Sequence, residues 1–524
     1  MDAPNGLGRG VCIDRAVNAA ISAIRLTSIP ASGIGSRSAA GPTALDCLPV
    51  GVRRPVEATP ILELSMTNGS RAHQNRDQLR TVFTAYNLTM ELGLHANRWT
   101  IRSLRAALAN GTQLPTALAH QALERSNQNA SRNTYLWQHP AWTLAEAARA
   151  EAMPRAENGP FGDGRDALWG LPVSVKDCFD LADAPTTCGV RFYRDFHGNA
   201  AQDSWLVQRL RTSGAVITGK THLHPLAYGI TGENPEFGDC LQPLDSSALT
   251  GGSSSGAAAS VQEGSAVLAI GTDTGGSVRA PAALCGLAGY RASIGRGNWS
   301  GGAHLAQSFD TMGCLFRELS DAPLLADLFA PTPATPPQSF TRFAVVEGSF
   351  YQDCEPEILI SLRTTIRALE TLGLQSATVN VDWWTDSFQI FAPIQAWEAA
   401  RIHAGHFDQF DPSIRERLVW GASIGTNEIA ALRRQHDNFR AQMDQLMATH
   451  QILLLPATPV TRLPAGADHS TTRARLLRYT TPLSLAGVPI ITIPCTAGGM
   501  QLAAARGEDE GLLKLAARLG PRPA

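Results

Sequence analysis

The chain has 524 residues and a mass of 55.8 kDa, with 44% hydrophobic and 17% charged residues. This composition supports a sizeable buried core and excludes wholesale disorder. The 44 basic and 46 acidic side chains leave a net charge of −2, so we expect no nucleic acid as a partner. No apolar run approaches the roughly 18 residues that a transmembrane helix needs, so no membrane span is expected.

Nine cysteines are scattered along the chain, and none forms a C-x-x-C pair. This pattern favours free thiols in a reducing compartment over a disulfide framework or a zinc site. Residues 1–30 lack a continuous apolar segment after basic residues, so a secretory signal is not expected. We therefore expect a cytoplasmic protein with no metal site.

Lysine is rare in this sequence. Of the 44 basic residues only three are lysine, Lys176, Lys220 and Lys514, which leaves 41 arginines. Most arginine-for-lysine exchanges on a surface are nearly neutral, so each remaining lysine raises the question of whether arginine could have replaced it.

Residues 1–97 differ from the rest of the chain, because they contain several Gly/Pro/Ser clusters and only brief amphipathic stretches. We treat them as an N-terminal extension of uncertain order. They could be a loosely structured extension, sequence upstream of the natural start, or a transit peptide. From residue 98 the sequence becomes regular, and residues 98–524 are expected to form one domain.

Helices and short apolar strands alternate from Thr100 to Leu287. We expect helices over 101–110, 115–126, 142–152 and 204–211, and strands over 168–177, which ends in charged residues, and 215–218. A Pro/Thr-rich stretch at 331–337 marks a linker or excursion. A helical region at 394–450 and strands at 452–455 and 489–493 follow, so the pattern predicts an α/β layered fold.

The first motif, Gly214-Ala-Val-Ile-Thr-Gly219-Lys220-Thr221, matches the phosphate-binding pattern G-x-x-x-x-G-K-[ST]. Such a loop needs its four variable residues to form a turn whose N–H groups point inward, after a strand. Here the variable residues themselves look like a strand and the preceding segment looks helical. Nucleotide binding is therefore disfavoured.

The second motif, Gly252-Ser253-Ser254-Ser255-Gly256, satisfies the esterase pattern G-x-S-x-G. An esterase nucleophile also needs a hydrophobic strand running into the turn, and the preceding segment is polar and turn-like. The alanine-rich helix expected at 257–263 argues for an anchored loop rather than a flexible linker.

The third motif joins this loop to the segment after it. Residues 267–286 read as an apolar strand, a double-glycine turn, Ser277 and a helix with an early proline. A serine there lies beside freed backbone N–H groups, which could stabilise an oxyanion. A helix N-cap is the alternative role. The presence of Ser253 upstream, and of Lys176 after an apolar strand, favours catalysis.

Together these segments resemble the amidase signature family of serine hydrolases, over roughly residues 98 to 518. The resemblance is strongest in Gly170-Leu-Pro-Val-Ser-Val-Lys-Asp, in 249–283, and in Ser484-Leu-Ala-Gly-Val-Pro followed by Gly499-Met-Gln-Leu. It implies an amidase-signature α/β fold, with a central mixed β-sheet covered on both faces by helices.

The resemblance implies a Ser-cis-Ser-Lys triad in which Ser277 is the nucleophile, Ser253 the cis-serine and Lys176 the base. Arg279 would stabilise the loop or touch substrate, and no cofactor is expected. The implied oxyanion donors are the backbone N–H groups of Thr274, Gly275, Gly276 and Ser277, and Ala227 would lie on the pocket wall.

The sequence departs from the family pattern at four positions that are not catalytic. Ser255 replaces a glycine, Ala248 and Thr250 replace an arginine and a proline before the loop, and Ser484 stands where asparagine is usual. These changes bear on how the loop packs.

The triad needs a neutral Lys176, so its ordinary pKa of about 10.4 must fall toward 7–8. Burial can cause that fall, provided that the adjacent Asp177 points elsewhere. Arginine could not serve, because it does not give up its proton in proteins.

We therefore expect an amidohydrolase that cleaves a linear carboxamide through an acyl-enzyme. Two alternatives remain: the glutaminase (A-type) subunit of a tRNA-dependent amidotransferase, and a catalytically silent binding protein. The amidotransferase subunit typically has glutamine where this chain has Ala280. The expected partner is a small-molecule amide, and a homodimer is left open.

Overall fold

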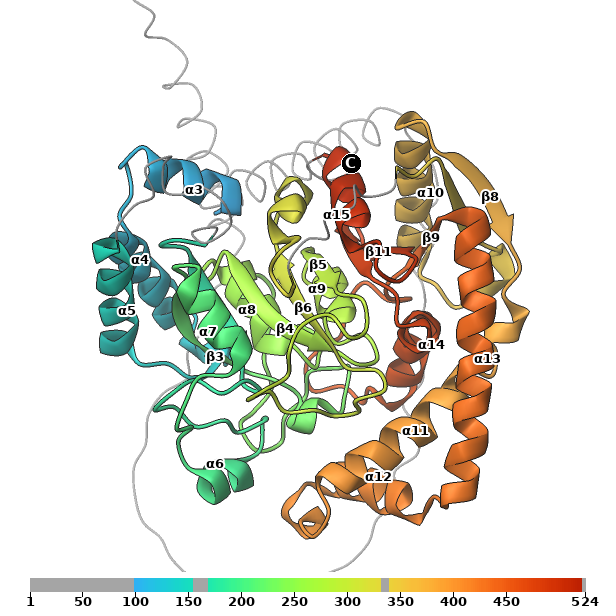
Figure 1. The fold of residues 1–524 in the computed structure, drawn as a ribbon, viewed down its shortest axis with the longest axis horizontal. Helices are drawn as coiled ribbons and strands as arrows, with labels where there is room; N and C mark the ends of the chain where they lie inside the picture. Colours follow the sequence, from blue (N-terminus) through green and yellow to red (C-terminus); the bar gives the residue numbers. More distant parts are fainter. Residues whose placement is uncertain (1–98, 154–167, 331–338, 521–524) are drawn as a thin grey trace, which may run out of the picture. The chain divides into compact units, whose positions relative to one another are not determined.

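The computed structural model describes residues 99–153, 168–330 and 339–520 (Figure 1). The predicted N-terminal extension (1–97) and the Pro/Thr-rich stretch (331–337) lie outside the described residues. None of the described helices is long and apolar enough to cross a membrane.

Eleven strands form one mixed sheet in the order β1-β3-β2-β4-β6-β5-β10-β11-β9-β7-β8. Strand β2 is parallel to β3 and β4, β4 is antiparallel to β6, and β7 is parallel to β8 and β9. The strand bounds are β1 Tyr135–Trp137, β2 Pro172–Lys176, β3 Val216–Thr221, β4 Leu268–Asp273, β5 Ala288–Arg291, β6 Thr311–Phe316, β7 Arg342–Val346, β8 Gln375–Val379, β9 Ile452–Pro456, β10 Ile490–Pro494 and β11 Gly499–Ala504.

Helices cover the sheet and its edges. Figure 1 shows α4 and α5 beside β3 near one edge and α10 and α13 near the other. The helix bounds are α3 Ile101–Ala109, α4 Pro115–Gln128, α5 Pro140–Ala152, α6 Arg191–His197, α7 Trp205–Thr212, α8 Ser255–Glu263, α9 Arg279–Leu284, α10 Pro356–Thr371, α11 Ser387–Ile402, α12 Pro412–Ser423, α13 Thr426–His450, α14 Ser470–Ala486 and α15 Asp509–Arg518.

The helices predicted before residue 265 are confirmed, and local chemistry explains where they begin. Thr100 forms a capping box with Ser103 at the start of α3, and Ser204 accepts from the N–H of Val207 at the start of α7. Helices α4 and α5 each begin with a proline, whose missing N–H costs nothing at the first helical position.

Strand β4 shows that both faces of the sheet are covered. Leu268 and Ile270 belong to the large core cluster, which also contains Leu210 of α7. Ala269, between them, belongs to a separate cluster with Ala258 of α8 and Ala282 of α9. Because successive side chains of a strand point to opposite faces, each face is buried against different helices. The predicted mixed α/β fold is confirmed.

Three glycines let the segment around Val278 lie close to the sheet. A Cβ added at Gly271 of β4, Gly289 of β5 or Gly313 of β6 would lie 3.2, 3.3 or 2.9 Å from a methyl carbon of Val278. Such separations are at or inside van der Waals contact, so larger residues would push this segment outward. The glycines therefore set the depth of the loop that carries Ser277.

The structure also decides between the competing motifs. The variable residues of the phosphate-loop pattern lie in β3, as the sequence indicated, so they do not form a phosphate-binding turn. No strand of the described residues runs into Gly252, and α8 begins at Ser255. Six cysteines of the described residues are free, as predicted: Cys178, Cys188, Cys240, Cys285, Cys314 and Cys354.

Candidate active site

Lys176 is the last residue of β2 and is fully buried. Its Nζ donates to Ser253 Oγ at 2.7 Å and to Thr272 Oγ1 at 2.8 Å. Burial lowers the pKa of Lys176 to about 8, against a smaller upward pull from the acidic groups around it, Cys178 first. The amine therefore exists in part as the neutral base near neutral pH, as the proposed proton relay requires.

Asp177, the residue after Lys176, points to a different cation. Its Oδ1 lies 2.6 Å from Nζ of Lys220, and both side chains are fully buried. Lys220 also donates to Thr186 Oγ1 at 2.7 Å. The expectation that Asp177 points away from Lys176 is confirmed, and Lys220 has a structural role as its counter-ion.

Ser253 follows a cis peptide bond between Gly252 and Ser253, as the family resemblance implied. The backbone at Gly252 packs closely against the backbone at Gly232. A Cβ on Gly252 would lie 2.7 Å from the backbone nitrogen of Gly232, so this position needs glycine. Ser255 starts α8 and is fully buried, and its Oγ donates to the Ser253 carbonyl at 3.5 Å. The substitution of serine for the usual glycine is thus accommodated.

Ser277 lies between β4 and α9, is 4% exposed and lines a pocket. Its carbonyl accepts from the N–H of Ser254 at 3.2 Å, which ties the two serine loops together. Among the described residues, no hydrogen bond joins Ser277 Oγ to Ser253 Oγ. Catalytic hydrogen bonds are often long before substrate binds, so this spacing is compatible with a relay.

The backbone N–H groups of the loop divide into two sets. Within the described part of the chain, Thr274, Gly275 and Ser277 have N–H groups with no hydrogen-bond acceptor. The N–H of Gly276 donates to Asp273 Oδ1 at 2.9 Å. Gly276 therefore anchors the turn, whereas the other three N–H groups are available to a ligand.

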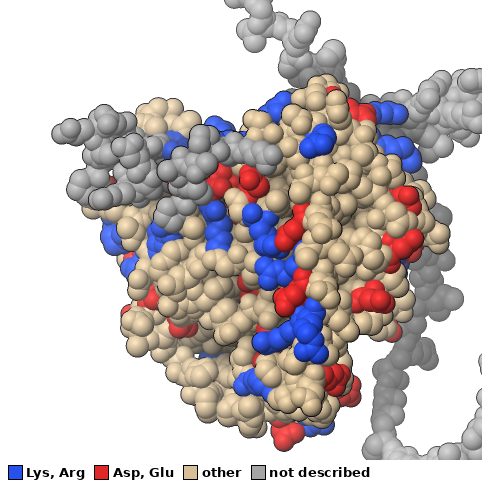
Figure 2. All heavy atoms as spheres, turned by 45° about the vertical axis from the view of Figure 1, so that its right-hand side comes forward, with Lys and Arg blue, Asp and Glu red and all other residues tan. Residues whose placement is uncertain are grey.

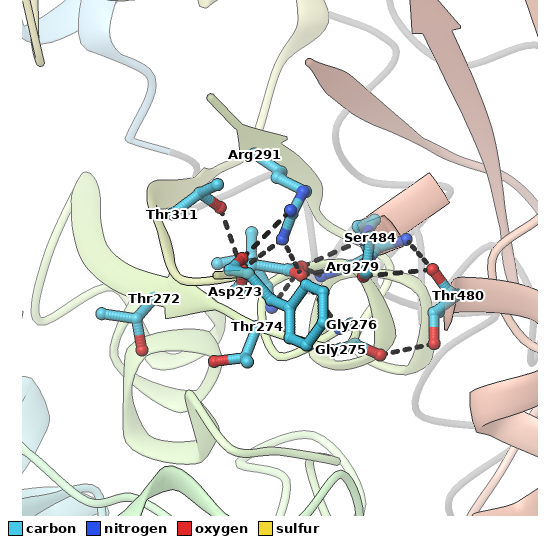
Figure 3. A network of polar contacts seen from close by, with 12 residues as sticks. Thr272, Asp273, Thr274, Gly275, Gly276, Arg279, Arg291, Thr311, Thr480 and Ser484 are labelled. Atoms are coloured by element: carbon cyan, nitrogen blue, oxygen red, sulfur yellow. Dashed lines mark hydrogen bonds and ion pairs between the residues drawn. The ribbon is translucent and has the colours of Figure 1, made fainter. Parts of the chain in front are cut away.

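Asp273 is the centre of the network that holds this loop (Figure 3). Its carboxylate accepts from the N–H of Val278 and pairs with two fully buried guanidinium groups, Arg279 and Arg291, each at 2.8 Å. These cations hold the pKa of Asp273 well below its usual range, although burial alone would raise it. Arg279 thus stabilises the loop, and no substrate role is needed to explain it.

The same network joins the loop to the C-terminal part of the chain. Arg279 donates to the Thr480 carbonyl at 2.9 Å, to Gln501 Oε1 at 2.8 Å and to Ser484 Oγ at 2.6 Å. Thr480 Oγ1 in turn donates to the Gly275 carbonyl at 2.5 Å. Ser484 therefore occupies the usual asparagine position with its hydroxyl as an acceptor for Arg279.

The pocket at Ser277 is built from four regions of the chain. Ala227 lies on its wall in the left-handed conformation, with φ 56°, which is uncommon for a residue other than glycine. Thr274 and Gly275 contribute the loop, and α11 and α14 close the far side. The lining residues are Ala227, Tyr228, Gly229, Ile230, Thr274, Gly275, Ser277, Gln395, Arg473 and Leu477.

The sequence matches the family described as Amidase over residues 120–513, which is well over half of the chain. The chain belongs to the amidase family.

Similar proteins agree with this assignment. Indoleacetamide hydrolase of Pseudomonas savastanoi is 30% identical over 446 residues, covering 79% of this chain and 94% of that protein. The A-type subunit of glutamyl-tRNA(Gln) amidotransferase from Koribacter versatilis (strain Ellin345) is 26% identical over 474 residues, covering 80% and 97%. A crystal structure of an amidase superposes with a TM-score of 0.72 at 29% identity, covering 80% of this chain and 99% of that one. This amidase is a hydrolase that cleaves amides.

Four residues in the site of this amidase were not predicted from sequence. Thr272 and Asp273 lie inside the segment 249–283 that resembles the family, but only the fold shows which contacts they make. Arg473 and Gln395 lie on helices far along the chain, and no local motif marks them. Helix periodicity could show which face of its helix each side chain occupies. It could not show that this face lies against Ser277.

Proposed function

We propose that this amidase hydrolyses a small linear carboxamide to a carboxylate and ammonia or an amine, through an acyl-enzyme on Ser277. The supporting observation is a fully buried amine, Lys176, at hydrogen-bond distance from Ser253, whose loop is tied to the loop of Ser277. An amide resists hydrolysis because its amine is a poor leaving group, so both attack and departure need proton transfer.

In the acylation step, Ser253 Oγ passes its proton to neutral Lys176 Nζ and takes the proton of Ser277 Oγ. Ser277 Oγ then bonds to the carbonyl carbon, and the electron pair of the C=O bond moves to oxygen. As the C–N bond breaks, the proton returns from Lys176 through Ser253 to the leaving nitrogen. The products of this step are the free amine and an ester on Ser277.

Water clears the ester by the same route. Its proton passes through Ser253 to Lys176, its oxygen attacks the ester carbon, and the proton then returns to Ser277 Oγ as the acid leaves. In both steps the negative oxygen would accept from the N–H groups of Thr274, Gly275 and Ser277. Removing one such donor typically costs on the order of 100-fold in rate.

Labelling with a fluorophosphonate, followed by mass mapping, tests the nucleophile. We expect the wild type to be labelled on Ser277 and Ser277→Ala to be unlabelled and inactive. Ser255→Gly, which restores the residue usual in the family, is the matched control and should keep the label. Labelling that persists in Ser277→Ala would contradict the assignment.

The relatives favour one second candidate, the A-type subunit of an amidotransferase, whose members cover nearly the same length. Such a subunit would depend on a partner chain for glutamine hydrolysis. The purified chain should hydrolyse simple amides without any second chain if it is an independent amidase. Glutamine hydrolysis that begins only with a copurified partner would favour the second candidate. A homodimer stays a prediction, which light scattering can test.

A further inference from the structure

Arg473 is a charged residue on the wall of the pocket that contains Ser277. It comes from the first turn of α14, Ser470–Ala486, and lines the pocket together with Thr274, Gly275 and Gln395. Because the mechanism proposed above uses Lys176, Ser253 and the loop alone, Arg473 has no role in it.

Unlike its neighbours, Arg473 has no acidic partner. Arg475 and Arg478, on the same helix, pair with Asp353 at 3.3 and 2.8 Å. On the face shown in Figure 2, basic and acidic side chains are interspersed in the same way. Within the described ranges, the Arg473 guanidinium makes no ion pair and no hydrogen bond to another residue. A half-buried guanidinium without a partner is costly unless a ligand supplies one.

A second cation strengthens the positive potential at this point. Arg417 of α12 lies close enough that Arg473 helps to lower its pKa to about 10, with burial as the larger cause. Burial likewise lowers the pKa of Arg473. Two nitrogens of Arg417 are already engaged, since its Nε and Nη1 donate to the carbonyls of Ser413 and Tyr228. Arg473, and not Arg417, is the guanidinium that lines the pocket.

The described residues of the pocket lining include no aspartate or glutamate. An anionic group on a substrate would therefore meet Arg473 without a competing carboxylate, whereas an ammonium group would find no counter-ion. The planar guanidinium matches the two oxygens of a carboxylate, which it can bind with paired hydrogen bonds.

We infer that Arg473 binds a carboxylate on the substrate, so that the preferred substrates are amides with a second, free carboxylate, such as the monoamides of short dicarboxylic acids. This inference rests on the proposed function, because it concerns the substrate of the same site. The carboxylate would dock on α14 while the amide carbonyl lies at the loop of Ser277. Arg473 would act as a specificity-determining residue and would not take part in proton transfer.

The test compares kcat/KM for malonamate, succinamate and glutaramate with kcat/KM for their neutral methyl esters. We expect the wild type to prefer the anion at one chain length, by on the order of 30-fold, the usual worth of a charge-assisted hydrogen bond. Arg473→Met should lose this preference and keep its rate on the neutral ester. Arg475→Met, on the same helix but facing Asp353, should retain the wild-type preference.

L-Glutamine provides a further comparison, because it differs from glutaramate by an α-ammonium group. Glutaramate should be the better substrate, since the pocket offers that ammonium no acid. Equal kcat/KM for anion and ester in the wild type would overturn the inference. So would an Arg473→Met variant that loses anionic and neutral substrates alike, as expected if Arg473 stacks on an aromatic amide or only holds the fold.

Failure of the inference and failure of the proposed function can be told apart. If the wild type hydrolyses neutral amides without an anion preference, the function stands and the inference fails. If no amide is hydrolysed, calorimetry of succinamate binding to Ser277→Ala tests Arg473 separately. Binding that is lost in Ser277→Ala/Arg473→Met supports the carboxylate site, and equal binding or no binding to Ser277→Ala contradicts it.

Discussion

Lys176 and Lys220 lie on adjacent strands of the sheet, one register step apart, and both are fully buried. Lys220 faces a carboxylate, Asp177, at 2.6 Å, so its positive charge is matched. Lys176 faces only the hydroxyls of Ser253 and Thr272, and burial lowers its pKa to about 8. Two equally buried lysines can thus have different partners, a carboxylate for Lys220 and hydroxyls for Lys176, and so different roles.

The largest expected effect comes from Lys176→Arg. Arginine keeps the positive charge but cannot accept the proton of Ser253 at any accessible pH. We expect kcat/KM to fall by at least about 10⁴-fold, the upper end for loss of a general base. Steady-state kinetics measure it, with circular dichroism as the folding control. A well-folded Lys176→Arg enzyme with more than a tenth of the wild-type rate would be incompatible with a basic role.

Lys220→Met tests the structural role of the second buried lysine. It leaves the Asp177 carboxylate buried without its counter-ion, which typically costs about 3–5 kcal/mol in the free energy of unfolding. The uncompensated negative charge should also raise the pKa of Lys176. Denaturant unfolding and the pH dependence of kcat/KM measure the two effects.

The double variant Lys220→Met/Asp177→Asn provides the control for that prediction. It removes both charges, so it should recover part of the lost stability and return the kinetic pKa toward the wild-type value. A single variant as stable as the wild type would show that the pair is not needed.

The pH profile of the wild type follows from the lowered pKa of Lys176. Because the neutral amine is the base, kcat/KM should rise about tenfold per pH unit and level off near pH 8. Between about 8 and 10.5 the folded state binds fewer protons at this residue than the unfolded state does. Its contribution to the free energy of unfolding therefore increases with pH over that range. A kcat/KM that falls as pH rises from 6 to 8 would contradict the assignment.

The smallest effects are expected from removing one hydroxyl at each lysine. Thr272→Val removes an acceptor from Lys176 and should lower kcat/KM several-fold, because a hydrogen bond of this kind is worth about 1 kcal/mol. Thr186→Val removes an acceptor from Lys220 and should lower the free energy of unfolding by a similar amount without changing kcat/KM. If Thr272→Val and Thr186→Val lowered kcat/KM equally, the proposed difference in role between Lys176 and Lys220 would be wrong.

The sequence allowed the α/β class, the main helices and the three candidate catalytic residues to be predicted, because each lies in a local pattern or a family motif. The hydrogen bonds from Arg279 to Thr480 and Gln501 could not be predicted, since both residues lie more than 200 positions after Arg279 in the chain. The Asp177–Lys220 pair was missed because only the parallel pairing of β2 with β3 brings the two residues together. Strand β1 was missed because its three residues are too short for periodicity to mark them.

Lysine NMR tests the central claim most directly, because the chain contains only three lysines. Protein labelled with ¹³C and ¹⁵N at lysine gives three side-chain signals, which Lys176→Arg and Lys220→Met assign. We expect the Lys176 signal to titrate near pH 8. A Lys176 signal that stays protonated to pH 10 or above would contradict the account.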